Sequence, residues 1–338
     1  MQVPPFSLSD QISFLGTDLE NAVLRVLRSG QYIGGPEVEA FEANFADTLK
    51  VPYVVGCNSG TDALVLALRA LDIGKGDEVI TSAFSFFATA EAISQVGAKP
   101  VFIDIEIDSY LMDLDKIEHA ITTRTKAILP VHLFGFPIDM DKLINIAKKN
   151  GLKVIEDCAQ AAGAKWNNSP VGSLGDIGCF SFFPTKNLGA AGDAGAVATA
   201  DPILSKRMRE LAVHGMPKRY IHSELGYNSR LDAIQAAILN VKLSHMSNWV
   251  KRRQAISEFY MENLSDIEGI ELPLKPISKN IFHSWNQFVI RVSQNHKSHI
   301  NSYSKSYLRD ELKSNLQQEG VNTIIYYPVP IHKQPAYQ

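Results

Sequence analysis

The stretch YVVGCNSGTDALVLALRALDIGKGDEVITS at residues 53–82 predicts the fold of this chain. It opens on a β-rich apolar run, continues with apolar residues three and four positions apart, and closes on a second β-rich run. This alternation is typical of a strand–helix–strand unit in a mostly parallel sheet. Gly74 and Gly76 stand before the second run, where glycine readily ends a helix.

The same alternation continues to Thr199 and predicts a wound α/β domain. The seven expected strands are Tyr53–Gly56, Glu78–Thr81, Pro100–Ile103, Ala127–Val131, Lys153–Ile155, Cys179–Phe182 and Gly195–Thr199. A long helical pattern follows at Leu231–Leu264. The end of the chain differs and predicts a smaller α+β lobe, with strands at Phe288–Val292 and Asn322–Tyr327 and a helix at Tyr307–Glu319.

Composition excludes several classes of protein. The 338 residues are 45% hydrophobic and 20% charged, as in a globular protein of about two domains. The net charge of −3 argues against a nucleic-acid partner, and no apolar run is long enough to span a membrane. Cys57, Cys158 and Cys179 lack C-x-x-C spacing, so we expect no disulfide framework, no metal site and a reducing, cytoplasmic location.

The segment NSGTDAL at residues 58–64 directly follows a predicted strand and opens a helix. A helix N-terminus offers unpaired N–H groups, so Gly60 and Thr61 could bind a phosphate closely. Taken alone, the segment is better explained by Ser59 as an ordinary helix cap. Neither a P-loop nor a dinucleotide-binding glycine motif is present.

Two further segments place reactive side chains after predicted strands. Asp157, in VIEDCAQ at residues 154–160, ends a strand, and ligands of parallel sheets bind at the carboxyl ends of strands. Lys186, in FSFFPTKNLG at residues 180–189, stands among apolar and small residues that would lower the pKa of its amine. A phosphate cup, a carboxylate and an amine together are what pyridoxal 5'-phosphate (PLP) requires.

With these motifs, the chain resembles the DegT/DnrJ/EryC1/StrS family of PLP-dependent nucleotide-sugar aminotransferases, from GQYIGGPEV at residues 30–38 to the end. The resemblance implies the α/β fold type I of PLP-dependent transferases, with a seven-stranded sheet. It implies a large PLP-binding domain at residues 10–245 and a small C-terminal domain at 246–338, with the N-terminal arm 1–9 near it. Family members usually continue for some tens of residues further, so we expect the small domain to be incomplete at its C-terminus.

The resemblance also assigns roles at the cofactor. It makes Lys186 the lysine that forms the Schiff base and Asp157 the partner of the pyridine nitrogen. Gln160 would lie beside the phenolic oxygen, and Phe86, in FSFFAT at residues 84–89, would stack on the ring. The residues that would hold the phosphate are Gly60, Thr61 and Ser181.

The resemblance also assigns roles at the dimer interface and the substrate site. In GYNSRLD at residues 226–232, Asn228 would reach the cofactor phosphate of a neighbouring subunit, which implies a homodimer with active sites at the interface. Arg230 would bind an anionic group of the donor or sugar, and His332 would line the sugar-nucleotide site. His132 matches a position near the cofactor, and its role stays open.

The implied reaction transfers an amino group from L-glutamate to a keto-sugar nucleotide and releases 2-oxoglutarate. Gln160 favours a 3-keto over a 4-keto carbon, because many 4-keto enzymes of the family have His there. The PLP-dependent sugar dehydratases of the family are an alternative, but they have His in place of Lys186, so Lys186 argues against them. The same scaffold could also belong to a non-catalytic PLP-binding regulator or to an aminotransferase that makes 3-amino-5-hydroxybenzoate.

Overall fold

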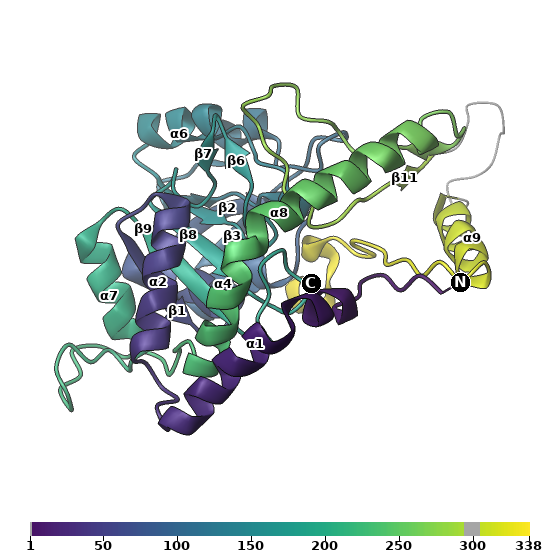
Figure 1. The fold of residues 1–338 in the computed structure, drawn as a ribbon. Helices are drawn as coiled ribbons and strands as arrows, with labels where there is room; N and C mark the ends of the chain where they lie inside the picture. Colours follow the sequence, from purple (N-terminus) through teal and green to yellow (C-terminus); the bar gives the residue numbers. More distant parts are fainter. Residues whose placement is uncertain (1, 294–304) are drawn as a thin grey trace.

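A seven-stranded sheet forms the centre of the molecule (Figure 1). The computed structural model describes residues 2–293 and 305–338. The strands follow the spatial order β1-β9-β8-β5-β4-β2-β3, and each of the seven strands expected up to Thr199 is present within two residues of its predicted bounds. Their bounds are β1 (Tyr53–Cys57), β2 (Glu78–Ser82), β3 (Lys99–Ile103), β4 (Thr125–Leu129), β5 (Lys153–Asp157), β8 (Ile177–Ser181) and β9 (Gly195–Thr199).

Strand direction brings several chain segments to one edge of this sheet. Strands β3, β2, β4, β5 and β8 are mutually parallel along the order of the sheet, and β9 runs antiparallel to both β8 and β1. Strand β1 therefore points the same way as β8. As a result, the last residues of β1, β5 and β8 and the first residue of β9 all lie at the same edge, where Asp157 and Ser181 end their strands.

Helices cover both faces of the sheet, which explains why its strands read as nearly continuous apolar runs (Figure 1). On one face, Phe45 of α2 packs edge-on against Phe180 and Phe182, with ring centroids 5.0 and 5.3 Å apart. The helices are α1 (Ser9–Ser29), α2 (Pro36–Leu49), α3 (Gly60–Ala70), α4 (Ala88–Gln95), α5 (Ile117–Ala120), α6 (Met140–Lys149), α7 (Pro202–Ala212), α8 (Ala233–Leu264) and α9 (Lys305–Gln318).

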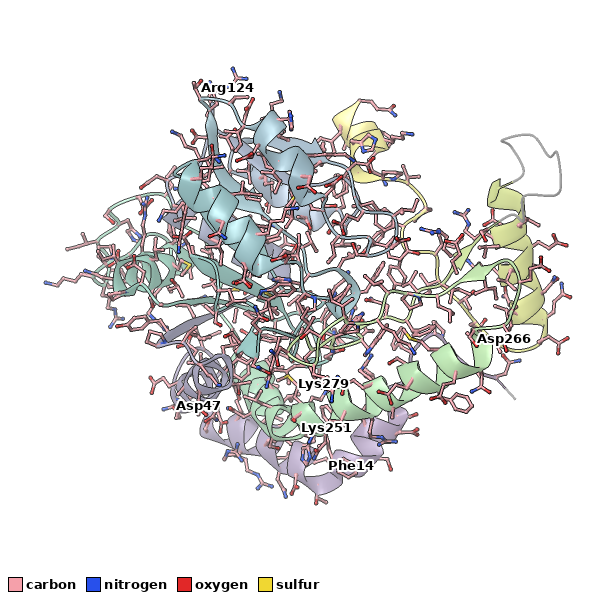
Figure 2. The ribbon with its side chains drawn as sticks, turned by 90° about the horizontal axis from the view of Figure 1, so that it is seen from above. Phe14, Asp47, Arg124, Lys251, Asp266 and Lys279 are labelled. Carbon is pink, nitrogen blue, oxygen red and sulfur yellow. The ribbon has the colours of Figure 1, made fainter. Side chains whose placement is uncertain are left out.

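Helix α8 passes without a break through the predicted domain boundary at residues 245 and 246. It lies beside α1, where the ring of Phe14 meets that of His245 at 5.3 Å, and extends toward Asp266 (Figure 2). Short antiparallel pairs complete the described fold: β6 (Lys165–Trp166) with β7 (Ser169–Pro170), and β10 (Ile270–Glu271) with β11 (Arg291–Val292). The division into two domains stays a prediction.

The end of the chain departs from the predicted pattern. The strand expected at 288–292 is reduced to β11, and the strand expected at 322–327 is not formed. Among the described residues, its backbone pairs only at its start, where Val3 of the N-terminal arm accepts a hydrogen bond from the Asn322 N–H at 2.9 Å. Short 3₁₀ turns follow at Ile331–Lys333 and Pro335–Tyr337. The first docks on the large sheet, because the Ile331 N–H donates to the carbonyl of Ala83.

The three cysteines are unpaired and buried in the sheet region. Burial raises the pKa of the thiols of Cys57, Cys158 and Cys179. Among the described residues, no helix has both the length and the apolar character that crossing a membrane requires.

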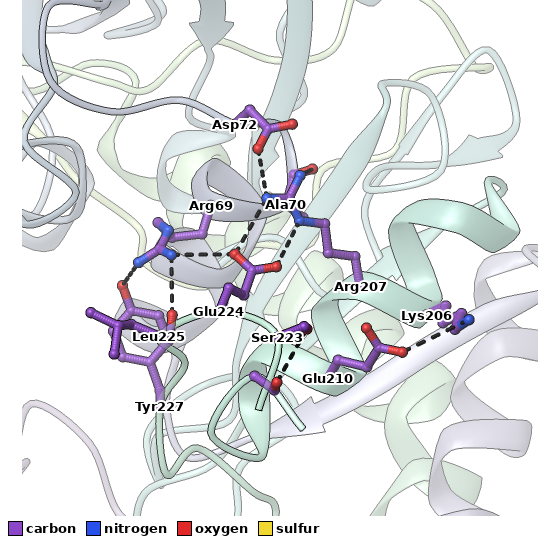
Figure 3. Close-up of polar contacts among 11 residues, drawn as sticks. Arg69, Ala70, Asp72, Lys206, Arg207, Glu210, Ser223, Glu224, Leu225 and Tyr227 are labelled. Carbon is purple, nitrogen blue, oxygen red and sulfur yellow. Dashed lines mark hydrogen bonds and ion pairs between the residues drawn. The ribbon is translucent and has the colours of Figure 1, made fainter. Parts of the chain in front are cut away.

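An ion-pair network holds the loop between α7 and α8 (Figure 3). Glu224 in this loop pairs with Arg69 of α3 at 3.4 Å and with Arg207 of α7 at 3.3 Å. Arg207 also pairs with Asp72 at 2.6 Å, and Arg69 donates to the hydroxyl of Tyr227 at 3.2 Å. The residues that follow Tyr227 are thereby fixed relative to α3.

Candidate active site

The N-terminus of α3 forms a cup at the shared edge of the sheet. The Ser59 hydroxyl caps the helix by accepting from the Asp62 N–H at 3.1 Å, whereas the N–H groups of Gly60 and Thr61, the first two of the helix, have no intrahelical partner. A Cβ on Gly60 would lie 2.6 Å from the Cβ of Ser181. Only glycine therefore allows the end of β8 to approach this helix, and the three predicted phosphate-binding residues are brought together.

The segment 228–230 lies beside the same cup. Asn58 donates from its side-chain amide to the carbonyl of Asn228 at 2.8 Å and accepts from the Arg230 N–H at 3.2 Å. Ser229 donates to the carboxylate of Asp62, in the first turn of α3, at 2.7 Å. The backbone is thus fixed against its own chain, while the Asn228 side chain is exposed.

Asp157 is buried at the end of β5, where its side chain is 4% exposed. One carboxylate oxygen accepts from the Thr89 hydroxyl at 2.8 Å, and the other accepts from the Ala159 N–H at 3.0 Å. Burial raises the pKa of the Asp157 carboxyl, and these two hydrogen bonds and the charge of Lys186 oppose the rise. The carboxylate is held in one orientation and is electrostatically coupled to the lysine.

Lys186 is carried by a tight loop after β8. A Cβ on Gly189 would lie 2.4 Å from the Pro184 carbonyl, so glycine is required for the loop to close, and Lys242 of α8 donates to the Gly189 carbonyl at 2.8 Å. Burial lowers the pKa of the Lys186 ammonium, and the carboxylate of Asp157 opposes this shift. A lysine with a lowered pKa is more readily the neutral amine that attacks a carbonyl.

Gln160 joins three segments near Asp157. Its side-chain oxygen accepts from the Phe134 N–H at 2.7 Å, and its amide nitrogen donates to the Tyr327 hydroxyl at 2.8 Å. Burial raises the pKa of that hydroxyl. The amide has a second hydrogen that the bond to Tyr327 does not use. The sequence motifs do not predict Tyr327 as a site residue; its only sequence signal is its place at the start of the loop that contains His332.

Phe86 stands at the start of α4, one turn before the residue that bonds Asp157. Its carbonyl accepts from the Thr89 N–H at 3.2 Å, and its side chain is 60% exposed. An aromatic side chain this exposed, three residues before the threonine that bonds Asp157, is available to stack on a flat ligand.

His132 has a structural position behind the site. Its Nδ1 accepts from the Ile138 N–H at 3.2 Å, so its proton lies on Nε2, 3.0 Å from a carboxylate oxygen of Glu156. Potential metal ligands of His132, Glu156 and Cys158 lie within 4.8 Å of one another. The Glu156 carboxylate already accepts from the N–H groups of Gly172, Leu174 and Gly175, so it is engaged in holding the loop 172–175.

The two predicted substrate residues lie at different places. Arg230 is the last residue of the segment beside the cup at the start of α3, and it is partly buried. His332 is exposed on the 3₁₀ turn 331–333, with its ring 6.2 Å from that of Phe102 on β3. The described contacts of His332 do not include the residues around Asp157.

Comparison with known proteins identifies the chain. The model of the DegT/DnrJ/EryC1/StrS aminotransferase family matches residues 14–338. The chain belongs to this family. It is 45% identical to the UDP-N-acetyl-3-dehydro-alpha-D-glucosamine 3-aminotransferase of Acidithiobacillus ferrooxidans, over 99% of this chain and 86% of the relative.

Solved structures of DegT/DnrJ/EryC1/StrS aminotransferases confirm the predicted fold class. DesV of S. venezuelae, in complex with a ketimine intermediate, has a TM-score of 0.92 and 42% identity, over 99% of this chain and 86% of DesV. NtdA of Bacillus subtilis, with bound cofactor PMP, has a TM-score of 0.85 and 34% identity, over 100% of this chain and 75% of NtdA.

PLP is the cofactor of the DegT/DnrJ/EryC1/StrS aminotransferases, and the residues at this edge fit it. The Gly60 and Thr61 N–H groups would be available to donate to its phosphate, and the close approach at Gly60 would add the Ser181 hydroxyl. Asp157 would offer a fixed carboxylate to the pyridine nitrogen, and Lys186 would offer an amine to the aldehyde. When bound, PLP supplies the electron sink that stabilises a carbanion next to the amino group.

Proposed function

We propose that this protein is a PLP-dependent aminotransferase that moves an amino group from L-glutamate to a keto-sugar nucleotide in amino-sugar, polysaccharide or O-antigen biosynthesis. The observation that carries the proposal is geometric: the buried Asp157 carboxylate, the loop that carries Lys186 and the N–H groups at the start of α3 lie at one edge of the sheet. The name of the 45% identical relative, a nucleotide-sugar 3-aminotransferase, supports the same substrate class.

Each residue has a proposed task. The Nζ of Lys186 would hold the cofactor through its aldehyde and, as a free amine, would carry a proton at the reacting carbon of the substrate. Asp157 keeps the pyridine nitrogen protonated by placing a negative charge against it. Phe86 and Gln160 fix the plane of the ring. The proposed phosphate ligands are Gly60, Thr61, Ser181 and Asn228.

A lysine at position 186 favours amino transfer over sugar dehydration, because the dehydratase branch of the family has His at this position. Gln160 favours amination at a 3-keto carbon. We propose Arg230 as a ligand for an anionic group of the donor or the sugar, and His332 as a residue of the sugar-nucleotide site. The unpaired cysteines are typical of a reducing compartment, so we propose a cytoplasmic enzyme.

An amination assay tests the proposed function directly. The PLP-loaded protein is incubated with L-glutamate and with 3-keto or 4-keto forms of UDP- and dTDP-sugars, and 2-oxoglutarate and amino sugar are measured. We expect one 3-keto substrate to exceed its 4-keto counterpart by about 10²-fold in kcat/KM. Preference for a 4-keto sugar would overturn the assignment of the carbon. Absence of amino transfer to all of these sugars, with PLP bound, would overturn the substrate class.

We also propose a homodimer in which Asn228 reaches the cofactor phosphate of the neighbouring subunit. The support is that the backbone at 228–230 is fixed while the Asn228 side chain is exposed. The loop that precedes it is held by Glu224.

Asn228→Ala should weaken PLP binding by about 10- to 100-fold, because a hydrogen bond to a charged group contributes about 1.5–3 kcal/mol. Equilibrium dialysis against PLP and sedimentation velocity measure affinity and assembly together. Asn315→Ala, at an exposed position of α9, is the matched control. A native protein that binds PLP tightly as a monomer would contradict the dimer.

A further inference from the structure

We infer that Thr89 is a positioning residue for Asp157: its hydroxyl fixes the carboxylate that faces the pyridine nitrogen and keeps the shared proton on that nitrogen. The inference rests on the proposed function, since it concerns how the chain holds PLP. It adds a residue to which sequence reasoning assigns no role, although Thr89 ends the segment FSFFAT at residues 84–89.

The hydrogen bond between Thr89 and Asp157 is short and buried away from solvent. The Oγ1 of Thr89 lies 2.8 Å from Oδ2 of Asp157, and the two side chains are 1% and 4% exposed. An ionised carboxylate has no hydrogen to give, so the threonine is the donor. A hydrogen bond from a buried donor to a charged acceptor is stronger than one between neutral groups.

A second hydroxyl stands behind the first. The Oγ of Ser85 lies 2.9 Å from Oγ1 of Thr89, and both side chains are buried. Because the Thr89 hydrogen is directed at Asp157, Ser85 must donate to Thr89. The result is a chain of two donors that ends on the carboxylate, and successive hydrogen bonds in such a chain strengthen one another.

The backbone supplies the remaining constraint. The Ala159 N–H binds the other carboxylate oxygen at 3.0 Å, so both oxygens are held and the plane of the carboxylate is fixed. Thr89 lies in the first turn of α4 and Phe86 lies two residues before the helix, where its carbonyl accepts from the Thr89 N–H. One helix end therefore sets both the carboxylate at the ring nitrogen and the aromatic side chain proposed to stack on the ring.

The chemical consequence follows because the Asp157 carboxylate and the pyridine nitrogen would share one proton. A donor to the carboxylate makes it a weaker base, which leaves the proton on the pyridine nitrogen. Without the Thr89 hydroxyl the carboxylate becomes more basic and the proton moves toward Asp157. The ring then loses its positive charge and stabilises the developing carbanion less well.

The test compares T89V, which keeps the shape of the side chain and removes the donor, with T89S, which keeps the donor. Each dimer is loaded with PLP labelled with ¹⁵N in the pyridine ring, and the nitrogen resonance is recorded at neutral pH. We expect the native protein and T89S to show a protonated nitrogen, and T89V to shift toward the unprotonated position. We also expect kcat for amino transfer from glutamate to fall about 10- to 100-fold in T89V alone, with KM within about threefold of native.

The outcomes separate this inference from the proposed function. A T89V protein with a protonated nitrogen and native kcat, but a lower melting temperature, would show a merely structural threonine and overturn the inference. A native protein that does not bind PLP through Lys186 would overturn the proposed function instead.

A measurement on PLP-free protein covers the case in which T89V does not bind the cofactor. In protein labelled with ¹³C at the aspartate Cγ, the Asp157 resonance is assigned by its loss in D157N. The pKa of the carboxyl should be higher in T89V than in native protein or T89S, because the valine withdraws a donor. Equal pKa values would overturn the inference.

Discussion

Lys186→Ala should abolish the visible absorption band of the PLP-loaded protein and lower the rate of amino transfer by at least about 10³-fold. In the proposed function the same Nζ would both attach the cofactor and carry the proton, and among the described residues no second lysine is coupled to Asp157 in this way. Folding should be retained, because removing a buried amine whose pKa is lowered by burial takes away a group that is costly to charge.

Three measurements test this prediction together. They are the absorbance of the PLP band, the glutamate-dependent formation of 2-oxoglutarate and thermal unfolding. Lys251→Ala, at an exposed position of α8, is the matched control and should behave as native protein. A Lys186→Ala protein that retains the band would refute the assignment of the Schiff-base lysine.

Asp157→Asn should lower amino transfer by about 10²- to 10³-fold while PLP remains attached to Lys186. An asparagine keeps the shape but carries no charge, so it cannot hold a proton on the pyridine nitrogen. Its oxygen can accept from the Ala159 N–H, and its amide can donate to the Thr89 hydroxyl, which is free to turn toward Ser85. The fold should therefore tolerate the change.

The pyridine ¹⁵N resonance and single-turnover kinetics with glutamate are the measurements. Asp115→Asn, whose side chain is 79% exposed and pairs with Lys142 at the surface, is the control. Native-like rates in Asp157→Asn would mean that another group protonates the ring, and the role given to this carboxylate would be wrong.

The central sheet is predictable from sequence because its strands are buried on both faces and separated by well-marked helices. Local pattern alone identifies runs such as Gly195–Thr199, and the structure confirms all seven. The prediction of a strand at 322–327 is wrong because a strand needs a partner strand. Among the described residues, the backbone of this segment pairs only with Val3. Pairing over such distances along the chain is not encoded in composition.

The same contrast applies to the site. Lys186, Asp157 and Gly60 follow strands in recognisable motifs, so their meeting at one edge follows from the topology of a parallel sheet. Thr89 gives no such signal, because a threonine in the first turn of a helix has many ordinary explanations. Only the folded chain brings it 2.8 Å from a carboxylate that is 68 positions away in the sequence. Tyr327 meets Gln160 across an even longer separation.

Helix α8 gives the molecule a long lever. Its 32 residues form a rod about 48 Å long, so a tilt of about 5° at Ala233 would displace Leu264 by about 4 Å. In its first third, Lys242 binds the loop that carries Lys186, and further along Arg253 donates to the carbonyls of Trp285 and Asn286. Small errors in packing near the start of the helix are therefore magnified toward its far end, whereas the reactive loop, bound closer to the pivot, is displaced less.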